Sequence, residues 1–234
     1  MKKQPGWCSW SLAALLLGAG GSARAADLGF YVVLDGASTS ADLSLVDFNE
    51  AAALLVDRPA VLGVTKDTKA KGYNITVGYQ LGSYFAIEGN YIQGAKFTYD
   101  FLMEGEGAGG GDAVGRWRIK PVGPTVAAVG LLPLGPYFSV DAHAGFFFIE
   151  NKHKVTLNNG SSDEELKLSD TKTAPFVGAG ISWWITGQVA LRLGFNEYHK
   201  AIKFRWYDRE GFTTTLFKRN ATQYTLGLRY SYGY

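Results

Sequence analysis

The chain has 234 residues, a formal net charge of +2, 30 glycines and 14% aromatic residues. Of its 23 basic residues, Lys2, Lys3 and Arg24 precede position 26 and no acidic residue does, which leaves 20 basic against 21 acidic residues in the remainder. That balance excludes the positive surplus typical of nucleic-acid-binding proteins, so no nucleic-acid partner is expected. The single cysteine, Cys8, also lies in this segment, so the remainder offers neither disulfides nor thiolate metal ligands.

The first 25 residues have the organisation of a secretory signal peptide. Lys2 and Lys3 give a positive start, residues 10–18 form a short apolar run, and residues 23–25 offer a small–x–small cleavage pattern. The run is too short to cross a bilayer as a helix, which takes about 20 residues. We therefore expect residues 1–25 to be a cleaved signal peptide and residues 26–234 to form one exported β-barrel domain.

The rest of the chain alternates apolar and polar residues with a period of two. Tyr73, Ile75 and Val77, for example, are separated by single polar or small residues. This is the pattern of β-strands whose two faces meet different surroundings. Eight such strands are predicted, at residues 27–37, 73–81, 85–91, 125–133, 137–150, 174–185, 188–198 and 220–234. The pattern leaves only the facing of the fourth strand unassigned.

Short and long connections alternate between these strands. Glycine-containing links of two or three residues predict tight hairpins, at residues 82–83, 134–136 and 186–187. Long connections separate the hairpins, at residues 38–72, 96–123, 152–173 and 199–218. Short periplasmic turns and long outer loops are the arrangement of outer-membrane barrels. Within the first long connection, residues 60–64 offer an additional strand and residues 42–56 an amphipathic helix over the barrel mouth.

The closing strand carries the clearest two-sided pattern. Small or polar residues form one face, and the apolar face consists of Tyr224, Leu226, Leu228, Tyr230, Tyr232 and Tyr234. Such a ribbon would aggregate in water but suits a strand that faces lipid. With its aromatic positions Tyr230, Tyr232 and Tyr234, this end resembles the C-terminal strand by which the barrel-assembly machinery recognises outer-membrane barrels for insertion.

A soluble barrel of the lipocalin or streptavidin kind also alternates, but its polar face meets water and carries many lysines and glutamates. Here the polar face is mostly Gly, Ser, Thr, Asn and Gln, and the lysines concentrate in the long connections. Aromatic residues gather beside the short turns and at the ends of the long connections, as in the interfacial belts of membrane barrels. The sequence therefore predicts an all-β, eight-stranded antiparallel up-and-down transmembrane β-barrel.

A family resemblance covers nearly all of this barrel. The segments that carry the resemblance are GYNITVGYQLGSYFAIEGNYI at 72–92, AAVGLLPLGPYFSVDAHAGFFF at 127–148, FVGAGISWWITGQVALRLGF at 176–195 and YTLGLRYSYGY at 224–234. With ADLSLVDFNEAAALLV in the first long connection, they resemble the OmpA-like outer-membrane β-barrel family, in particular its small stand-alone barrels. The resemblance implies an outer-membrane location and interior ion pairs that plug or gate the barrel. Relatives with a peptidoglycan-binding domain continue beyond the barrel, and this chain is expected to lack that tether.

Charged residues on the polar faces are the first candidate site. If the apolar faces meet lipid, five ionisable side chains point into the lumen, namely Glu88, Asp141, His143, Arg192 and Arg229. Buried charges must be paired, so we expect the two acids and the two arginines to form one network. Side chains nearly fill the interior of an eight-stranded barrel. The network therefore either fills the core or gates a narrow, porin-like pore for ions or small solutes.

The last long connection is the second candidate site. It combines basic and aromatic residues, namely Lys203, Arg205, Trp206, Tyr207 and Lys218. Loops on a rigid scaffold commonly carry recognition, and this composition suits contact with anionic lipopolysaccharide. A strand pair that extends above the membrane is the alternative for the same residues.

Enzymatic patterns are weak, and no enzyme activity is expected. Residues 105–110 have the glycine spacing of a dinucleotide site without its strand–turn–helix context. His143, His153 and His199 lack metal-ligand spacing, so neither a metal nor a cofactor is expected. A lipid-modifying outer-membrane enzyme, which needs a serine beside a histidine near the interface, is a remote alternative. The expected role is that of a structural barrel, and no feature demands more than a monomer.

Overall fold

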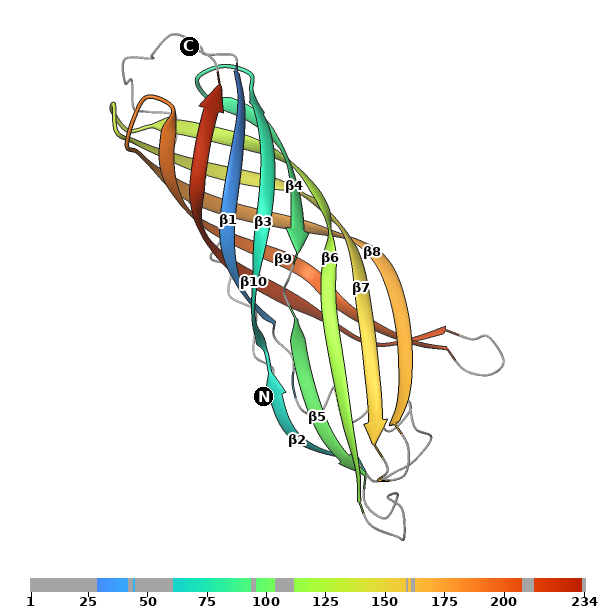
Figure 1. Cartoon of the computed structure of the whole chain (residues 1–234). Coiled ribbons are helices and arrows are strands. Elements are labelled where there is room, and N and C mark those ends of the chain that lie inside the picture. The colour runs from blue at the N-terminus through green and yellow to red at the C-terminus, as the bar shows by residue number, and fades with distance from the viewer. Residues whose placement is uncertain are drawn as a thin grey trace, which may run out of the picture.

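The computed structural model describes residues 29–41, 44, 61–93, 96–103, 112–158, 160, 163–207 and 213–232. These residues form ten strands (Figure 1): β1 (Gly29–Ala41), β2 (Val61–Asp67), β3 (Lys69–Gln80), β4 (Phe85–Gln93), β5 (Phe97–Met103), β6 (Ala113–Pro133), β7 (Phe138–Asn158), β8 (Asp163–Trp184), β9 (Val189–Tyr207) and β10 (Thr213–Tyr232). No helix among the described residues is long and apolar enough to cross a membrane. The expected signal peptide and, apart from Ser44, the expected helix at residues 42–56 lie outside them.

Eight of the strands close into a ring. The antiparallel sheet has the order β2-β5-β6-β4-β3-β1-β10-β9-β8-β7, and β6 also pairs with β7. β2 leads into β3 across Thr68, and β5 follows β4, so these two strands prolong members of the ring. β6 accordingly pairs with β4 along residues 123–130 and with β5 along residues 113–119. The predicted eight-stranded antiparallel barrel is confirmed, and so is the additional strand near residues 60–64.

Side chains in the ring alternate between an apolar outer face and a polar inner face. On β4, Phe85 and Ile87 point outward with 67% and 51% of their surface exposed, whereas Glu88 is buried. The strand whose facing the sequence left open is now assigned, because Val126 on β6 points outward and its odd-numbered neighbours are buried. The two faces therefore divide as the sequence predicts.

Strands continue into all four long connections, so the connections are shorter than the sequence predicts. For the last one, the structure has the alternative, a strand pair that extends the barrel. β7 and β8 pair as far as Asn158 and Asp163, and β9 pairs with β10 as far as Tyr207 and Thr213. These added lengths, together with β2 and β5, form what we call the outer extension, at the end of the barrel opposite the short turns. The short turns themselves lie where the sequence predicts them.

In the outer extension β7 keeps its alternation but exchanges the polarity of its two faces. Along the inner face of β7, polar residues near the short turn give way to buried Phe147, Ile149 and Val155. On its outer face, Phe148 is followed by the charged residues Glu150 and Lys152. An outer face beside lipid must be apolar, whereas one in water carries charge at little cost. The charged segments that the sequence predicts as loops are therefore strands whose outer face meets water instead of lipid.

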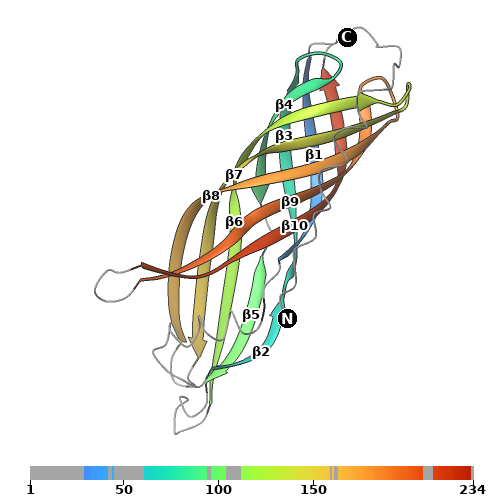
Figure 2. The ribbon, with the colours of Figure 1, turned by 180° about the vertical axis from the view of Figure 1, so that it is seen from behind.

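The outer extension splits on one side. β8 and β9 both run on, but they pair only along residues 176–184 and 190–198. In Figures 1 and 2 the far ends of β9 and β10 leave to one side, away from the far ends of β6, β7 and β8. Where it departs, Lys200 has a positive φ of 51°, and its N–H donates to Asn220 Oδ1 at 2.7 Å. The register of β9 against β10 shifts at the same place, between Arg219 and Ala221, which marks a β-bulge.

Replacing Gly145 by alanine tests the close approach of β6 and β7. A Cβ at Gly145 would overlap the carbonyl oxygen of Val126, a backbone atom that cannot move without disturbing the strand pair. We expect Gly145→Ala to destabilise the barrel by about 1–3 kcal/mol, measured as a lower temperature for loss of the folded band on SDS gels. The control is Gly130→Ala on β6, whose Cβ would meet nothing closer than Ala142 O at 3.7 Å. Equal melting of the two variants would contradict this account.

Candidate functional site in the barrel lumen

Three of the five lumen residues predicted from the sequence meet inside the barrel. Arg192 on β9 donates from Nη1 to Glu88 Oε1 on β4 at 3.1 Å, and from Nη2 to Asp141 Oδ1 on β7. All three side chains are buried. β4 and β9 lie four strands apart in either direction around the ring, so the pair with Glu88 spans the lumen. The expected pairing of buried acids with an arginine is present.

His143 extends this network along β7. Its Nδ1 lies 3.3 Å from Asp141 Oδ1, and its Nε2 lies 2.6 Å from Asn196 Oδ1 on β9. The neighbouring strand β8 makes room for these side chains, because a Cβ at Gly178 would overlap the imidazole and a Cβ at Gly180 the carboxylate of Asp141. The small residues of the inner face thus allow bulky polar side chains to lie across it.

Arg229 joins the network through an aromatic ring. Its guanidinium carbon lies 3.7 Å from the ring centroid of Tyr31, and its Nη2 donates to Gln80 Oε1 at 3.2 Å. The Tyr31 hydroxyl in turn donates to Glu88 Oε1 at 2.8 Å. Among the described residues Arg229 therefore makes no ion pair with either acid, and both carboxylates contact Arg192. The expected direct pairing of two arginines with two acids is corrected to this arrangement.

A second polar hub, not predicted from the sequence, is centred on Gln223 of β10. Gln223 Oε1 accepts hydrogen bonds from Asn74 Nδ2 at 3.0 Å, Tyr198 Oη at 3.1 Å and Asn196 Nδ2 at 3.4 Å. Its Nε2 donates to Thr39 Oγ1 at 3.2 Å. Strand parity already assigns Gln223 to the inner face, so the signal was present in the sequence. Only the pairing of β10 with its neighbours shows that the amide gathers four partners.

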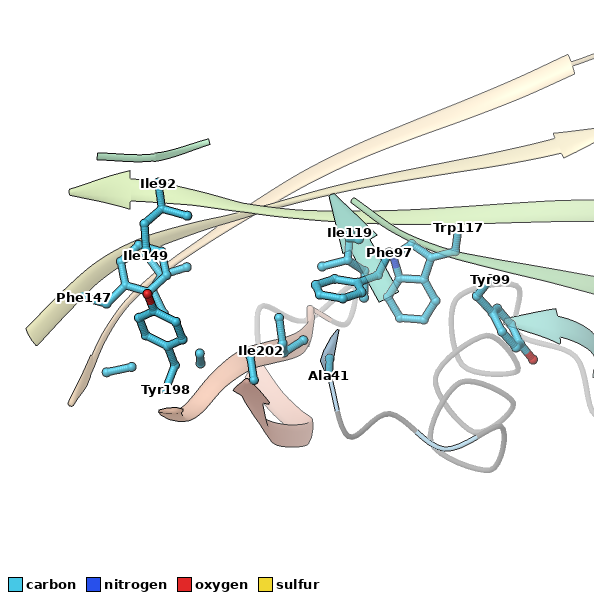
Figure 3. Packing of buried hydrophobic residues seen from close by; sticks show 14 of the residues in the cluster. Ala41, Ile92, Phe97, Tyr99, Trp117, Ile119, Phe147, Ile149, Tyr198 and Ile202 are labelled. Atoms are coloured by element: carbon cyan, nitrogen blue, oxygen red, sulfur yellow. The ribbon is translucent and has the colours of Figure 1, made fainter. Parts of the chain in front are cut away.

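An apolar core fills the outer extension beyond the polar residues. Figure 3 shows Phe97, Trp117 and Ile119 lying together, and Tyr198 beside Phe147. The rings of Phe147 and Tyr198 are 5.3 Å apart between centroids. Among the described residues, the polar network thus lies in the lumen of the ring, and most side chains buried in the outer extension are apolar.

The residues predicted to form an outer surface on the last connection differ in where the structure places them. Lys203 is only 3% exposed and lies 3.5 Å from Asp170 Oδ2 on β8, so its placement on the surface is wrong. The bulge at Lys200 is the reason, because it shifts the alternation of β9 and turns this side chain inward. Lys218 is exposed as expected. Arg205, Trp206 and Tyr207 belong to a paired strand, but their side chains lie outside the described part.

The closing aromatic residues face outward where the structure describes them. Tyr230 and Tyr232 on β10 are exposed, and their rings meet edge to face with centroids 4.5 Å apart. Tyr234 lies outside the described residues. Their part in assembly stays a prediction.

His153 is a further buried group that the sequence did not single out. Its Nδ1 accepts a hydrogen bond from Trp117 Nε1 at 3.3 Å, within the apolar core of the outer extension. Burial lowers the pKa of His153 from its usual 6.5 to about 4, although the charge of Asp170 acts in the opposite direction. The packed outer extension therefore holds a neutral imidazole.

A closed antiparallel barrel with an apolar outer belt and a polar interior is the architecture of an outer-membrane β-barrel. Residues 49–234 match the family described as the OmpA-like transmembrane domain. The chain belongs to this family and is a small outer-membrane β-barrel protein, in contact with membrane lipid. A comparison with curated proteins found no match.

Solved structures of outer-membrane proteins are similar over almost their whole length. The outer membrane protein OprG of Pseudomonas aeruginosa is 14% identical, with 89% of this chain and 98% of that chain covered and a TM-score of 0.49. Neisserial surface protein A is 16% identical, with coverages of 87% and 97% and a TM-score of 0.45. The attachment invasion locus protein Ail of Yersinia pestis is 14% identical, with coverages of 88% and 99% and a TM-score of 0.44.

We expect His153 to make the packing of the outer extension sensitive to acid. An opened state would protonate this histidine below its usual pKa of 6.5, whereas the packed state protonates it only near 4. The contribution to stability is therefore complete above pH 6.5 and is lost progressively as pH falls toward 4. At about pH 5 the loss is about 2 kcal/mol.

Trp117 supplies the measurement, in a variant whose other tryptophans are replaced by phenylalanine. Its emission should move to longer wavelength between about pH 7 and about pH 5 as water reaches the core. His153→Gln should remove this change. Glu165, whose pKa its partners Lys154 and Lys167 lower to about 2, titrates below the window. An equal shift in the glutamine variant would contradict the assignment to His153.

Proposed function

We propose that the protein is a non-enzymatic scaffold of the outer membrane, with a closed lumen and an outer extension that contacts lipopolysaccharide. The observation that carries the closed lumen is the pairing of Arg192 with both Glu88 and Asp141 across the interior. Export through a signal peptide at residues 1–25 and insertion by the barrel-assembly machinery belong to the same proposal.

Several layers of side chains support closure. Toward the short turns, Arg229 lies between the rings of Tyr31 and Trp184, at 3.7 and 5.3 Å from their centroids. The Arg192 network follows, and the apolar core of the outer extension lies beyond it. An eight-stranded barrel has an interior that side chains can fill, so no further plug is needed. His143 is held by Asp141 and Asn196 and serves this network rather than a catalytic group.

A narrow gated pore is the second candidate, and one observation favours it. A cavity of about 30 Å³ lies in the lumen beside Arg192, lined by polar residues of both walls. Release of Arg192 from one of its two carboxylates would change the width of the passage at this level. The apolar core of the outer extension would still have to open for solutes to pass.

Single-channel conductance of the refolded protein in a planar bilayer tests the closed lumen. We expect no stable openings, and none in Arg192→Ala either, because the apolar core closes the outer half without the ion pairs. The control is Arg116→Ala, which removes an arginine paired with Asp100 on the exposed face at 2.6 Å. Reproducible wild-type openings would overturn the closed scaffold. Openings confined to the Arg192 variant would make the network a gate.

The basic side chains around the bulge in β9 support contact with lipopolysaccharide. Lys172 on β8 lies one residue beyond Thr173, the partner of the belt residue Phe148, so it stands at the outer edge of the apolar band. Its Nζ donates to the carbonyl oxygen of Lys200, which is exposed on the bulge, and Lys218 is exposed nearby on β10. Phosphate groups of a lipid headgroup would lie at this height.

These lysines repel one another. Partial burial, and then the charges of Lys218, Lys203 and Lys200, lower the pKa of Lys172. Asp170 opposes this effect, but Asp170 also pairs with Lys203. A phosphate anion would relieve the repulsion, and lysine is a common point-charge partner of phosphate.

Replacing Lys172, Lys200 and Lys218 together by glutamine should weaken binding of lipopolysaccharide about tenfold or more, since surface cations near a charged lipid contribute about 1 kcal/mol each. Binding is measured on lipopolysaccharide-containing vesicles. The control replaces Lys152, Lys154 and Lys167 by glutamine. It removes the same charge, but these lysines are already paired with Glu150 or Glu165. Equal binding by the two triple variants would dispose of this surface.

A further inference from the structure

Opposite Arg192, one wall of the lumen presents oxygen atoms. Asp35 on β1 pairs in register with Asn74 on β3, Thr76 on β3 pairs with Asn90 on β4, and Asn90 pairs with Thr125 on β6. All five line the same cavity of about 30 Å³. We call them the oxygen arc. It combines one carboxylate, two amides and two hydroxyls on four adjacent strands.

Three oxygens of the arc make no hydrogen bond within the described part of the protein, namely Asp35 Oδ1, Asn74 Oδ1 and Asn90 Oδ1. Asp35 is 7% and Asn74 is 2% exposed, so bulk water does not solvate them. Asn74 Nδ2 donates to Gln223 and so fixes the orientation of the Asn74 amide, which leaves Asn74 Oδ1 as the atom without a partner. Buried acceptors without donors are rare in proteins, and an ion or water commonly explains them.

Asp35 also makes no ion pair within the described part of the chain. Arg192 contacts Glu88 and Asp141, and Arg229 contacts Tyr31 and Gln80. Among the described residues, Asp35 makes no ion pair with either arginine. A buried carboxylate without a cation or a proton costs several kcal/mol. On the far side of the cavity, Arg192 contacts both Glu88 and Asp141, whose carboxylates offset its charge. His143 beside it is held by Asp141 and Asn196.

The geometry points to a binding site for one monovalent alkali cation of sodium size, held by Asp35, Asn74 and Asn90. Hard cations take carboxylate and amide oxygens as ligands. The cavity has room for a cation with a water, because one water-sized particle occupies about 10–15 Å³ on this measure. No group of three or more His, Cys, Asp or Glu in the described residues suits a metal ion, so a divalent site is not indicated. The site is independent of the proposed contact with lipopolysaccharide.

The test is thermal unfolding of the refolded full-length barrel in mixtures of sodium chloride and choline chloride at constant ionic strength. A cation that binds the folded barrel raises the unfolding temperature with the logarithm of its concentration. We expect a rise on the order of 5 °C over a hundredfold range of sodium. Choline is too large for the cavity and serves as the inert cation. Identical unfolding at every sodium concentration would overturn the site and leave a water molecule or a protonated Asp35 in the arc.

Two variants assign the effect to the oxygen arc. Asp35→Asn should remove the sodium dependence, whereas the control Asp100→Asn, which removes an exposed carboxylate paired with Arg116, should keep it. If Asp35→Asn fails to fold, Asn90→Ala retains the charge and removes one ligand. It should shift the sodium dependence to about tenfold higher concentration, the equivalent of about 1.4 kcal/mol. A dependence unchanged in these arc variants would place the cation elsewhere and overturn the inference.

Discussion

The closure of eight strands into a ring is the constraint on which the rest of the structure depends. It satisfies the backbone hydrogen bonds that lipid cannot satisfy, and it leaves an interior only wide enough for side chains. A charge that points inward must therefore find its partner on another wall at the same height. Arg192 does so with Glu88 from the opposite strand and Asp141 from β7. Removal of either the acids or the arginine would leave a buried charge unpaired, which is why the network is structural before it is anything else.

The same alternation of side chains serves two environments. In the belt, β7 turns Phe146 and Phe148 outward, whereas farther out it turns Phe147, Ile149 and Val155 inward around a core of its own. No change of register is needed on this strand, because only the residue types on the two faces are exchanged. The outer extension is thus a continuation of the barrel wall with an apolar interior, and Trp117 and His153 are packed within it. On β9 and β10 the continuation is interrupted by the bulge at Lys200, which directs the hairpin away from β8.

Local patterns predict some of these features and not others. A period of two is visible residue by residue, so the ring strands and the inward facing of Glu88, Asp141 and Arg192 follow from the sequence. Whether Glu88 contacts Arg192 or Arg229 depends on the heights that the strand register assigns, and register is not visible in one strand alone. The charges between residues 152 and 173 hid the outer parts of β7 and β8, because water and lipid favour opposite outer faces. Lys203 was misplaced because a bulge shifts parity and leaves no distinct mark in the sequence.

The closed lumen and the proposed cation site constrain each other. A cation held by Asp35, Asn74 and Asn90 lies beneath the apolar core of the outer extension, which excludes a hydrated ion. The bound cation must therefore exchange with solvent through the end of the barrel at the short turns. On this path it passes Tyr31 and Arg229, whose guanidinium repels cations. An ion that enters and leaves by the same side stabilises the barrel without being transported. Sodium-dependent stability together with the absence of conductance would thus be the combined signature of a sealed barrel with an internal ion.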